Sequence, residues 1–502
     1  MTSADRQQQL AHRTPVIVGV GQINDRSADP GQGMDPIALM EAALGIADAD
    51  GCGGWLSRLD SLAVVKQISF PELDDVAPQL ARRIGARPRL CADTPAPTGD
   101  APIRLLNEAA IKIGTGEIKV AAIVGGEALR TAGYRLGATQ TSNSGQSDSP
   151  AKSPASYRAQ YGLNAPVDLY PLYENASRPT FGQTLSEGQR ESSQIWSLFS
   201  QVAAGNSNAW LRQPMSPEEI ETISAKNRPM PFPYTKFMVA NSSVNQGAGF
   251  IVTSLAEARE RGIPESRIIY VGYGAAAREP DDVLLRDAYD RSASMSASLL
   301  RTLEFNRLTT DEIDHVELYS CFPCVPKMAR RIIGWPVERP ASVFGGLTFG
   351  GGPIANYMSH AVASMVDRLR DDGRYGLLFA NGGYATYNHS IVLGRQPITP
   401  GPYEQDFNVQ ADADAQRGPI PELVENYNGP ATIESYTVFF MRDGSVRSGV
   451  IVARTTDGKR TLASVPAEDH ETISLLVSGT REPIGAQGII STAGELQVWH
   501  SE

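Results

Sequence analysis

The sequence predicts an α/β protein made of two duplicated halves, followed by a small all-β unit. Three observations support this fold class. Short strings recur in the same order about 250 residues apart, beginning with VIVGVG at Val16 and IYVGYG at Ile269. Within each copy, β-branched runs alternate with helical stretches, the pattern of layered βαβ units. Near the end of the chain, strand-like runs are separated by Asp-Gly pairs typical of hairpin turns.

Four pairs of strings carry the duplication. After the first strands, LARRIGARP at Leu80 resembles MARRIIGWP at Met328, and API and VGGEA then match GPI and NGGYA. A period this long predicts a duplicated domain rather than a solenoid. We expect each half to be a mixed five-stranded sheet with helices, and the strands at Val16 and Ile269 to be equivalent.

Each copy shows the same order of elements. A buried strand is followed by a helix, a second strand, an arginine-rich helix, a glycine-rich turn, a longer helix and closing strands. The first helix is expected at residues 35–49 and 294–306, and the second strand at 59–65 and 313–319.

An insertion rich in Ser, Gln, Asn and Pro separates the halves. It includes SNSGQSDSPAKSPAS, which we expect to be mobile, and helical stretches such as ESSQIWSLFSQVAAGNSNAWL. After a Pro/Gly/Asp-rich connector, three strands split at Asp443 and Asp457 predict a small barrel or sandwich. The expected domains are an N-terminal half at 14–128 and 241–262, the insertion at 129–240, a C-terminal half at 263–400, a linker at 401–430 and the β unit at 431–502.

Composition excludes several function classes. The net charge of −11 argues against a nucleic-acid or anionic-membrane surface. No run of about 18 apolar residues occurs, so no membrane span is expected. Four cysteines in 502 residues are no disulfide framework. The opening MTSADRQQQLAHR does not have the pattern of a signal segment and is expected to be disordered. Because the cysteines form no disulfide framework, we expect a cytoplasmic location.

Several longer stretches resemble the thiolase superfamily over about residues 15–395. KFMVANSSVNQGAGF at Lys236 resembles the segment that returns from the thiolase loop domain to the core. HVELYSCFPCVPKMA at His315 resembles the turn read N-E-A-F in thiolases and H-D-C-F in sterol-carrier-type thiolases. GGLTFGGGPIAN at Gly345 resembles the G-H-P turn, and FANGGYA the C-x-G turn. The terminal segment looks like OB-type domains of some thiolase-like proteins. A five-layer αβαβα core is thereby implied.

The resemblance also implies Claisen chemistry on coenzyme A thioesters, which makes the protein an acyltransferase by family. Thiolases use two cysteines, a histidine and an Asn-bound water. Here Ala96 stands at the nucleophile position, Tyr319 at the N-E-A-F position, Gly352 at the histidine and Ala380 at the second cysteine. We therefore expect weak or absent Claisen activity. The alternative is a non-catalytic acyl-CoA-binding scaffold that acts with a partner enzyme through its C-terminal domain.

The cysteines are the remaining candidates for catalysis. Cys321 falls at the cysteine position of H-D-C-F, next to Tyr319, with a buried structural cysteine as the alternative. CFPC has metal or redox spacing, but zinc needs two further ligands, so no metal is expected. Cys91 precedes the nucleophile turn but ends a strand-like run instead of opening a helix. His315 and His389 are expected to be packing or surface residues.

Coenzyme A or an acyl-CoA is the implied ligand, without a permanently bound cofactor. The family serine that contacts pantetheine maps to Ser242, beside Ser243, although a helix N-cap pair explains both equally well. Gly351, Gly352 and Asn381 complete the expected binding site. The basic residues expected near the nucleotide phosphates are Arg212, Lys226 and Arg228.

The GGLTFGGG stretch places five glycines in eight residues. It fits a phosphate cradle, an active-site loop that points a helix N-terminus at the substrate, or only a tight turn. The resemblance favours the active-site loop.

The C-terminal unit is acidic, with six Arg/Lys against nine Asp/Glu from Ala431 on, so no nucleic-acid partner is expected. Family habit implies a homodimer, and a terminal domain that caps the dimer interface would leave a monomer.

Overall fold

The structure, a computed structural model, describes residues 9–139, 157–398 and 403–501. The SNSGQSDSPAKSPAS stretch, expected to be mobile, lies outside the described residues, as does most of the opening segment. Residues 9–11 form a helical turn in which Ala11 is buried, so the expectation of a disordered lead is wrong for them.

A nine-stranded sheet runs through the core. Its strands are β1 (Pro15–Asn24), β2 (Ser61–Val64), β3 (Leu90–Asp93), β4 (Val120–Ala128), β5 (Asn245–Ser254), β6 (Ile269–Arg278), β7 (His315–Leu318), β8 (Tyr375–Gly382) and β9 (Tyr387–Gly394). Their order is β3-β2-β4-β5-β1-β6-β9-β8-β7. The two copies meet at the centre, where antiparallel β1 and β6 place Val16 opposite Tyr270 and Ile17 opposite Ile269. The paired residues are the first two of each repeated string, Val16 and Ile17 in one and Ile269 and Tyr270 in the other, as expected for equivalent strands.

The C-terminal half has four strands instead of the five that we predicted. Its expected edge position is taken by irregular chain, in which Ala341 O accepts from Leu318 N–H at 2.9 Å. Pro336 and Pro340 precede this position in the sequence. Because proline cannot donate to a ladder, this segment is poorly suited to a regular edge strand.

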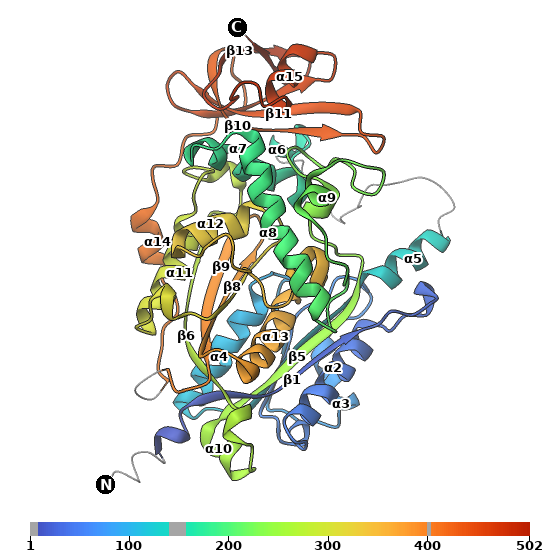
Figure 1. The fold of residues 1–502 in the computed structure, drawn as a ribbon, viewed down its shortest axis with the longest axis vertical. Coiled ribbons are helices and arrows are strands. Elements are labelled where there is room, and N and C mark those ends of the chain that lie inside the picture. The colour runs from blue at the N-terminus through green and yellow to red at the C-terminus, as the bar shows by residue number, and fades with distance from the viewer. Residues whose placement is uncertain (1–8, 140–156, 399–402, 502) are drawn as a thin grey trace.

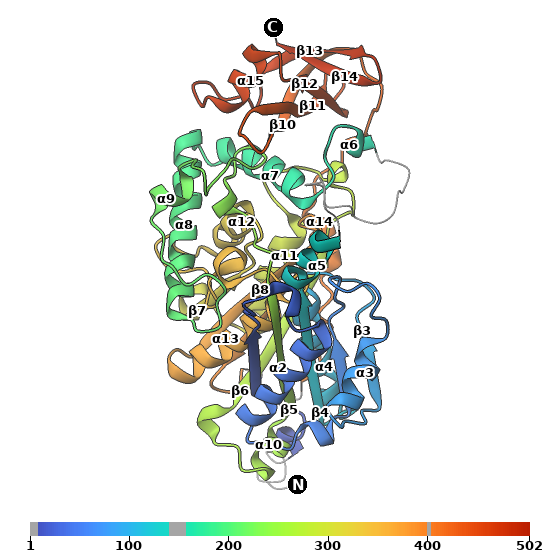
Figure 2. The ribbon, with the colours of Figure 1, turned by 90° about the vertical axis from the view of Figure 1, so that its right-hand side faces the viewer.

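Helices complete a five-layer αβαβα core, which confirms the predicted fold class (Figures 1 and 2). Two helices pack in the middle layer and contact strands from both halves, and the others cover the outer faces. The middle helices are α4 (Ala101–Thr115) and α13 (Tyr357–Asp371), and the outer ones are α2 (Pro36–Asp50), α3 (Val76–Arg83), α11 (Ala293–Phe305) and α12 (Cys324–Ile333). The first ten residues of α13 are all buried, as a helix between two sheets requires.

The insertion is mostly helical. Its long helix α8 starts with a capping box, in which Thr184 accepts from the N–H of Glu187 and the Glu187 carboxylate accepts in return. The inserted helices are α5 (Leu129–Thr139), α6 (Tyr157–Gln160), α7 (Pro166–Thr180), α8 (Leu185–Gly205) and α9 (Pro217–Glu221), and α10 (Leu255–Glu260) follows β5.

The C-terminal region forms a closed five-stranded barrel of OB-like type. The predicted turns are present at Asp443 and Asp457, but the prediction missed the last two strands, which follow a helix. The elements are α14 (Gln410–Gln416), β10 (Gly429–Phe440), β11 (Val446–Thr455), β12 (Arg460–Pro466), α15 (His470–Val477), β13 (Gln487–Ala493) and β14 (Leu496–Ser501), and the barrel order is β10-β11-β12-β14-β13. The domain boundaries drawn from the sequence stay a prediction.

The barrel packs on the insertion, not directly on the central sheet (Figures 1 and 2). Ser435 Oγ donates to Leu172 O at 2.6 Å, and Asn175 Nδ2 donates to Tyr436 O at 2.8 Å. Strand β10 is thereby fixed along α7, whose opposite face is directed to the core.

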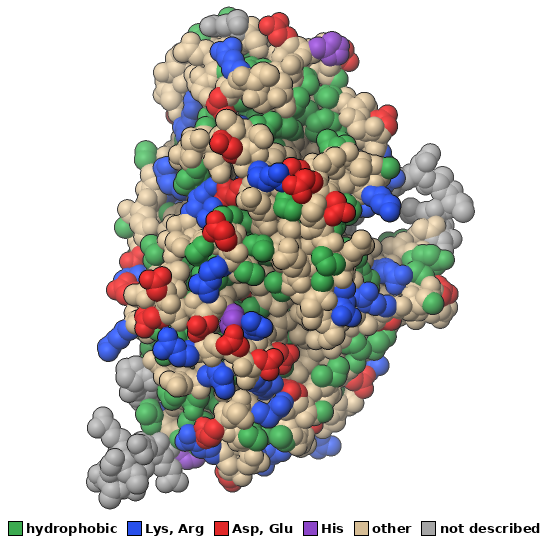
Figure 3. All heavy atoms as spheres, viewed as in Figure 1, with side chains coloured by type: hydrophobic (Ala, Val, Ile, Leu, Met, Phe, Trp, Pro, Cys, Tyr) green, Lys and Arg blue, Asp and Glu red, His purple; other side chains and the backbone are tan. Residues whose placement is uncertain are grey.

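In the described part of the chain, no helix is long and apolar enough to cross a membrane. On the face shown in Figure 3, acidic and basic side chains are interspersed over the core rather than gathered by sign.

Candidate functional site

Three turns singled out by the family resemblance are in contact. The turn holding Ala96 precedes α4, the turn after β7 begins at Tyr319, and Asn381 lies at the end of β8, just before the turn to β9. A Cβ added to Gly99 would lie 2.7 Å from the Tyr319 hydroxyl and 2.3 Å from Asn381 O. Positions more than 200 residues apart in the sequence are thus brought together.

The glycine-rich stretch is a tightly supported loop. The backbone φ is +110° at Gly345 and +104° at Gly351, values that favour glycine, and a π-helical turn lies between them. A Cβ at Gly351 would lie 2.2 Å from Gln246 Oε1. Ser342 Oγ accepts hydrogen bonds from the N–H groups of Gly345 and Gly346 at 2.7 and 3.0 Å. Glycine is therefore required by the conformation at both ends of the loop.

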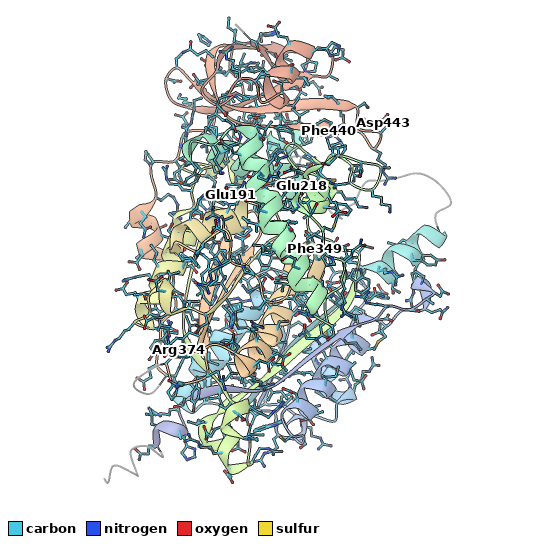
Figure 4. The ribbon with its side chains drawn as sticks, in the orientation of Figure 1. Glu191, Glu218, Phe349, Arg374, Phe440 and Asp443 are labelled. Atoms are coloured by element: carbon cyan, nitrogen blue, oxygen red, sulfur yellow. The ribbon has the colours of Figure 1, made fainter. Side chains whose placement is uncertain are left out.

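Several backbone donors of this loop are already engaged inside the protein. Leu347 N–H donates to Ser320 Oγ at 3.2 Å, and Gly352 N–H donates to Asn241 O at 2.8 Å. The loop also uses an acceptor: the backbone carbonyl of Phe349, a residue labelled in Figure 4, accepts from Leu211 N–H. These contacts favour the tight-turn interpretation over a phosphate cradle, because a cradle needs free N–H groups.

A buried carboxyl group, which the sequence analysis missed, holds the loop from behind. Glu317 on β7 accepts from Tyr357 Oη at 2.6 Å, from Ser342 Oγ at 2.9 Å and from Val343 N at 2.8 Å. Burial raises the pKa of Glu317 to about 7, and these donors partly offset the shift. Glu317 occurs in the quoted HVELY string, but nothing in the sequence marked it as polar support.

Tyr170 of α7 lies among the turns. Its hydroxyl donates toward Asn381 Oδ1 at 3.0 Å and Gly383 O at 3.1 Å, and it accepts from Ala385 N at 3.0 Å. Its ring stacks on Phe322 with 4.6 Å between centroids. The insertion therefore places a fully buried phenol against the turn that carries a catalytic cysteine in thiolases.

Asn381 has no free amide group in this arrangement. Its Oδ1 accepts from Tyr170, and its Nδ2 donates to Asn388 Oδ1 at 2.8 Å. As a ligand-binding residue it would have to exchange one of these partners.

The thiols at this site are poorly suited to nucleophilic attack. Burial raises the pKa of Cys321 to about 12 and raises that of Cys324 well above its ordinary value. Cys91 lies on β3, where burial and the Asp93 carboxylate raise its pKa. Among the described residues, no three potential metal-ligating side chains gather, at CFPC or elsewhere.

A buried ionic network, also missed from sequence, joins the insertion to α12. Lys327 Nζ donates to Glu174 Oε1 at 2.5 Å and to Ser192 Oγ at 2.9 Å, with the lysine side chain 2% exposed. Glu191 on α8, labelled in Figure 4, pairs with Arg331 at 2.5 Å. The network fixes α7 and α8 against the core, and so fixes Tyr170.

Ser242 and Ser243 are exposed beside the glycine-rich loop. The preceding residue, Asn241, bonds to that loop through both backbone groups, donating to Leu347 O and accepting from Gly352 N. The chain continues into strand β5, so the alternative that the two serines cap a helix is wrong.

The other candidates lie on the insertion and on the strands. Arg212 and Lys226 are exposed, and Arg228 donates to Pro229 O. His315 is half-buried at the start of β7, where burial lowers its pKa, and its Nε2 lies 3.3 Å from Asp372 O.

Comparison with solved structures places this geometry in a family. A monomeric SCP2-thiolase-like protein type 1 from Mycobacterium smegmatis matches with 30% identity and a TM-score of 0.81, over 98% of this chain and 99% of that one. The chain belongs to the SCP2-thiolase-like proteins of type 1. A family model described as the thiolase-like protein type 1 additional C-terminal domain matches residues 408–495, which include α14 and most of the barrel.

More distant structures share only the fold with this SCP2-thiolase-like chain. The Ltp2-ChsH2(DUF35) aldolase matches with 17% identity and a TM-score of 0.57, over 77% of this chain and 98% of that chain. Human mitochondrial 3-ketoacyl-CoA thiolase in complex with CoA matches with 14% identity and the same TM-score, over 77% and 98%. Among curated proteins, none matches.

Proposed function

We propose that this SCP2-thiolase-like protein binds coenzyme A or an acyl-CoA but does not perform Claisen chemistry at the thiolase turns. The observation that carries the proposal is the placement of Tyr170, whose hydroxyl is bonded to Asn381, Gly383 and Ala385. A substrate carbonyl would have to displace this buried side chain to reach the turn.

The side chains at the expected catalytic positions support the loss of chemistry. Ala96 has no nucleophile, Gly352 has no donor side chain and Ala380 has no thiol. Cys321, the thiol at this site, has a pKa of about 12, so little of it is thiolate near neutral pH. Losing one oxyanion donor alone costs on the order of 10²–10³ in rate, and residues that act as a unit fail together.

Coenzyme A binding rests on the fold and on the position of two serines. The human thiolase with the same fold is described as a complex with CoA. In this chain, Ser242 and Ser243 are exposed between the insertion and the glycine-rich loop, where the resemblance expects the pantetheine arm. The arm would approach along these serines and stop at Tyr170.

Two measurements test the proposal. After incubation with acetyl-CoA, intact-mass spectrometry should show no acyl adduct, and calorimetry should show binding of coenzyme A. Ser242→Ala should weaken binding by about 0.5–1.5 kcal/mol, the loss of one neutral hydrogen bond, whereas Ser57→Ala, at an exposed serine between α2 and β2, should not. A covalent adduct, or thiolysis at roughly 1–10³ per second, would refute the loss of chemistry. No heat with millimolar coenzyme A would refute binding.

A scaffold role with a partner enzyme is the second candidate. It is favoured by the barrel, which contacts α7 through Ser435 and Asn175, so a partner on the barrel would be one helix away from Tyr170. Under this proposal, removal of the barrel's contacts would change partner binding without changing coenzyme A affinity.

A further inference from the structure

A second cavity, of about 620 Å³, is lined by neither Tyr170 nor the exposed serines. It opens beside α14, on the left in Figure 1, between the start of α4, the end of β6 and the start of β9. Its volume is in the range of small-molecule sites. One wall is formed by Phe407, Asn408, Gln410 and Arg417, from the segment that leads into the C-terminal barrel.

That wall is attached to the core by backbone pairing. Ala276 N–H donates to Phe407 O at 2.7 Å, and Val409 N–H donates to Ala276 O at 2.9 Å. The family model of the additional C-terminal domain begins at residue 408, within this wall. The cavity is therefore completed by sequence that belongs to the type 1 proteins, not by the thiolase fold alone.

Two residues that line the cavity each hold a buried polar atom without a partner. These atoms are Oδ1 of Asp100, a residue that is 7% exposed, and Nδ1 of His389, which is fully buried. An unpaired buried polar atom costs free energy, so a bound group that pairs with it is stabilising.

The hydrogen bonds behind His389 fix its tautomer. Asn107 Nδ2 donates to Tyr403 Oη and Gln405 Oε1, and the tyrosine hydroxyl donates onward to Gly272 O. Asn107 Oδ1 is thus left to accept from His389 Nε2, at 3.1 Å. His389 Nδ1 then carries a lone pair and is a hydrogen-bond acceptor.

The rim charges are paired among themselves. Arg417 pairs with Glu279 at 2.9 Å, and Arg278 pairs with Asp281 at 2.6 Å. The rim therefore offers no strong unpaired charge, and the unpaired groups at the floor are acceptors. The walls are partly aromatic: the Phe407 ring lies 4.9 Å from the His389 ring between centroids, and Tyr387 is on the rim.

We propose that this cavity binds a small aromatic ring carrying at least two hydroxyl groups, which donate to Asp100 and His389 while the ring packs between Phe407 and Tyr387. The cavity leaves room for substituents on the ring. Cyclic polyols share the hydroxyl donors but lack the aromatic face, so the test includes one.

Calorimetry with the full-length protein distinguishes an aromatic diol from a cyclic polyol as the ligand. The probes are catechol, resorcinol and hydroquinone, with their dimethyl ethers as matched compounds that lack donors, and myo-inositol as the non-aromatic polyol. We expect at least one benzenediol to bind with a dissociation constant on the order of 1 mM or tighter, and at least tenfold more tightly than its dimethyl ether. Equal binding of diol and ether, or binding of inositol alone, would overturn the proposal.

Affinity measurements on substituted proteins test whether the aromatic ring binds in this cavity. Asp100→Asn should weaken benzenediol binding about tenfold, because one carboxyl oxygen is replaced by an amide nitrogen, which donates and does not accept. The Asp100 side chain makes no cap bond to α4, so this exchange leaves the helix start intact. Asp311→Asn, an exchange at an exposed residue that does not line the cavity, is the control and should change affinity less than twofold. If Asp100→Asn does not fold, Phe407→Leu tests the wall and should weaken binding about threefold. Unchanged affinity in either variant would overturn the proposal.

Discussion

Tyr170→Phe removes one oxygen atom from among the three turns that the family resemblance singled out. Three groups bond to that hydroxyl: Asn381 Oδ1, Gly383 O and Ala385 N–H. The single hydroxyl proton is shared between the two oxygens, so the change removes about two hydrogen bonds. It also leaves the Ala385 donor and the Asn381 acceptor buried without a partner.

Each such orphaned group costs about 1–3 kcal/mol, so the two groups together set the expected loss at about 2–6 kcal/mol. The ring remains and keeps its stacking on Phe322, so no cavity term adds to this figure. Because the chain has several domains, a single free energy of unfolding is poorly defined for it. Native-state hydrogen exchange of the Ala385 amide measures the local loss directly.

We expect the Ala385 amide to exchange about 30-fold faster or more in Tyr170→Phe, since 1.36 kcal/mol corresponds to a factor of ten. The matched control is Tyr384→Phe, which removes an exposed hydroxyl that donates to Asn164 O at 3.2 Å. It should leave exchange at Ala385 within about twofold. If the two variants behave alike, Tyr170 does not hold the turn through its hydroxyl.

Three further predictions follow from buried groups. Lys327→Met should destabilise the insertion by about 3–5 kcal/mol, because Glu174 is left as an uncompensated buried charge, whereas Arg190→Gln at an exposed pair should not change the denaturation midpoint. Glu317 has a folded pKa near 7, above its ordinary value near 4.5, so the folded state binds the extra proton between these values. Stability should therefore fall as pH rises from about 4.5 to 7, and equal pH slopes in wild type and Glu317→Gln would contradict this. Iodoacetamide at pH 8 should label exposed Cys52 quickly and buried Cys324 only on unfolding, and fast labelling of Cys324 in the native protein would show that it is not buried.

Local and repeated features were predictable from the sequence. The strings at Val16 and Ile269 predicted equivalent strands, because each β-branched, glycine-ended run specifies a buried strand by itself. The Asp-Gly pairs at Asp443 and Asp457 located two hairpin turns, since the turn type depends on those two residues alone. The resemblance also assigned the family's catalytic positions to Ala96, Gly352 and Ala380, and this assignment stays a prediction.

Only the tertiary structure decided which side chains fill the site. Tyr170 lies 211 positions from Asn381, and Lys327 lies 153 from Glu174, so no local pattern links the members of either pair. The fifth strand predicted for the C-terminal half fails for a local reason instead: Pro336 and Pro340 lack the N–H groups that a ladder beside Leu318 requires. Sequence patterns determine the conformation of short segments, whereas burial, hydrogen-bond partners and pKa shifts depend on which distant segments meet.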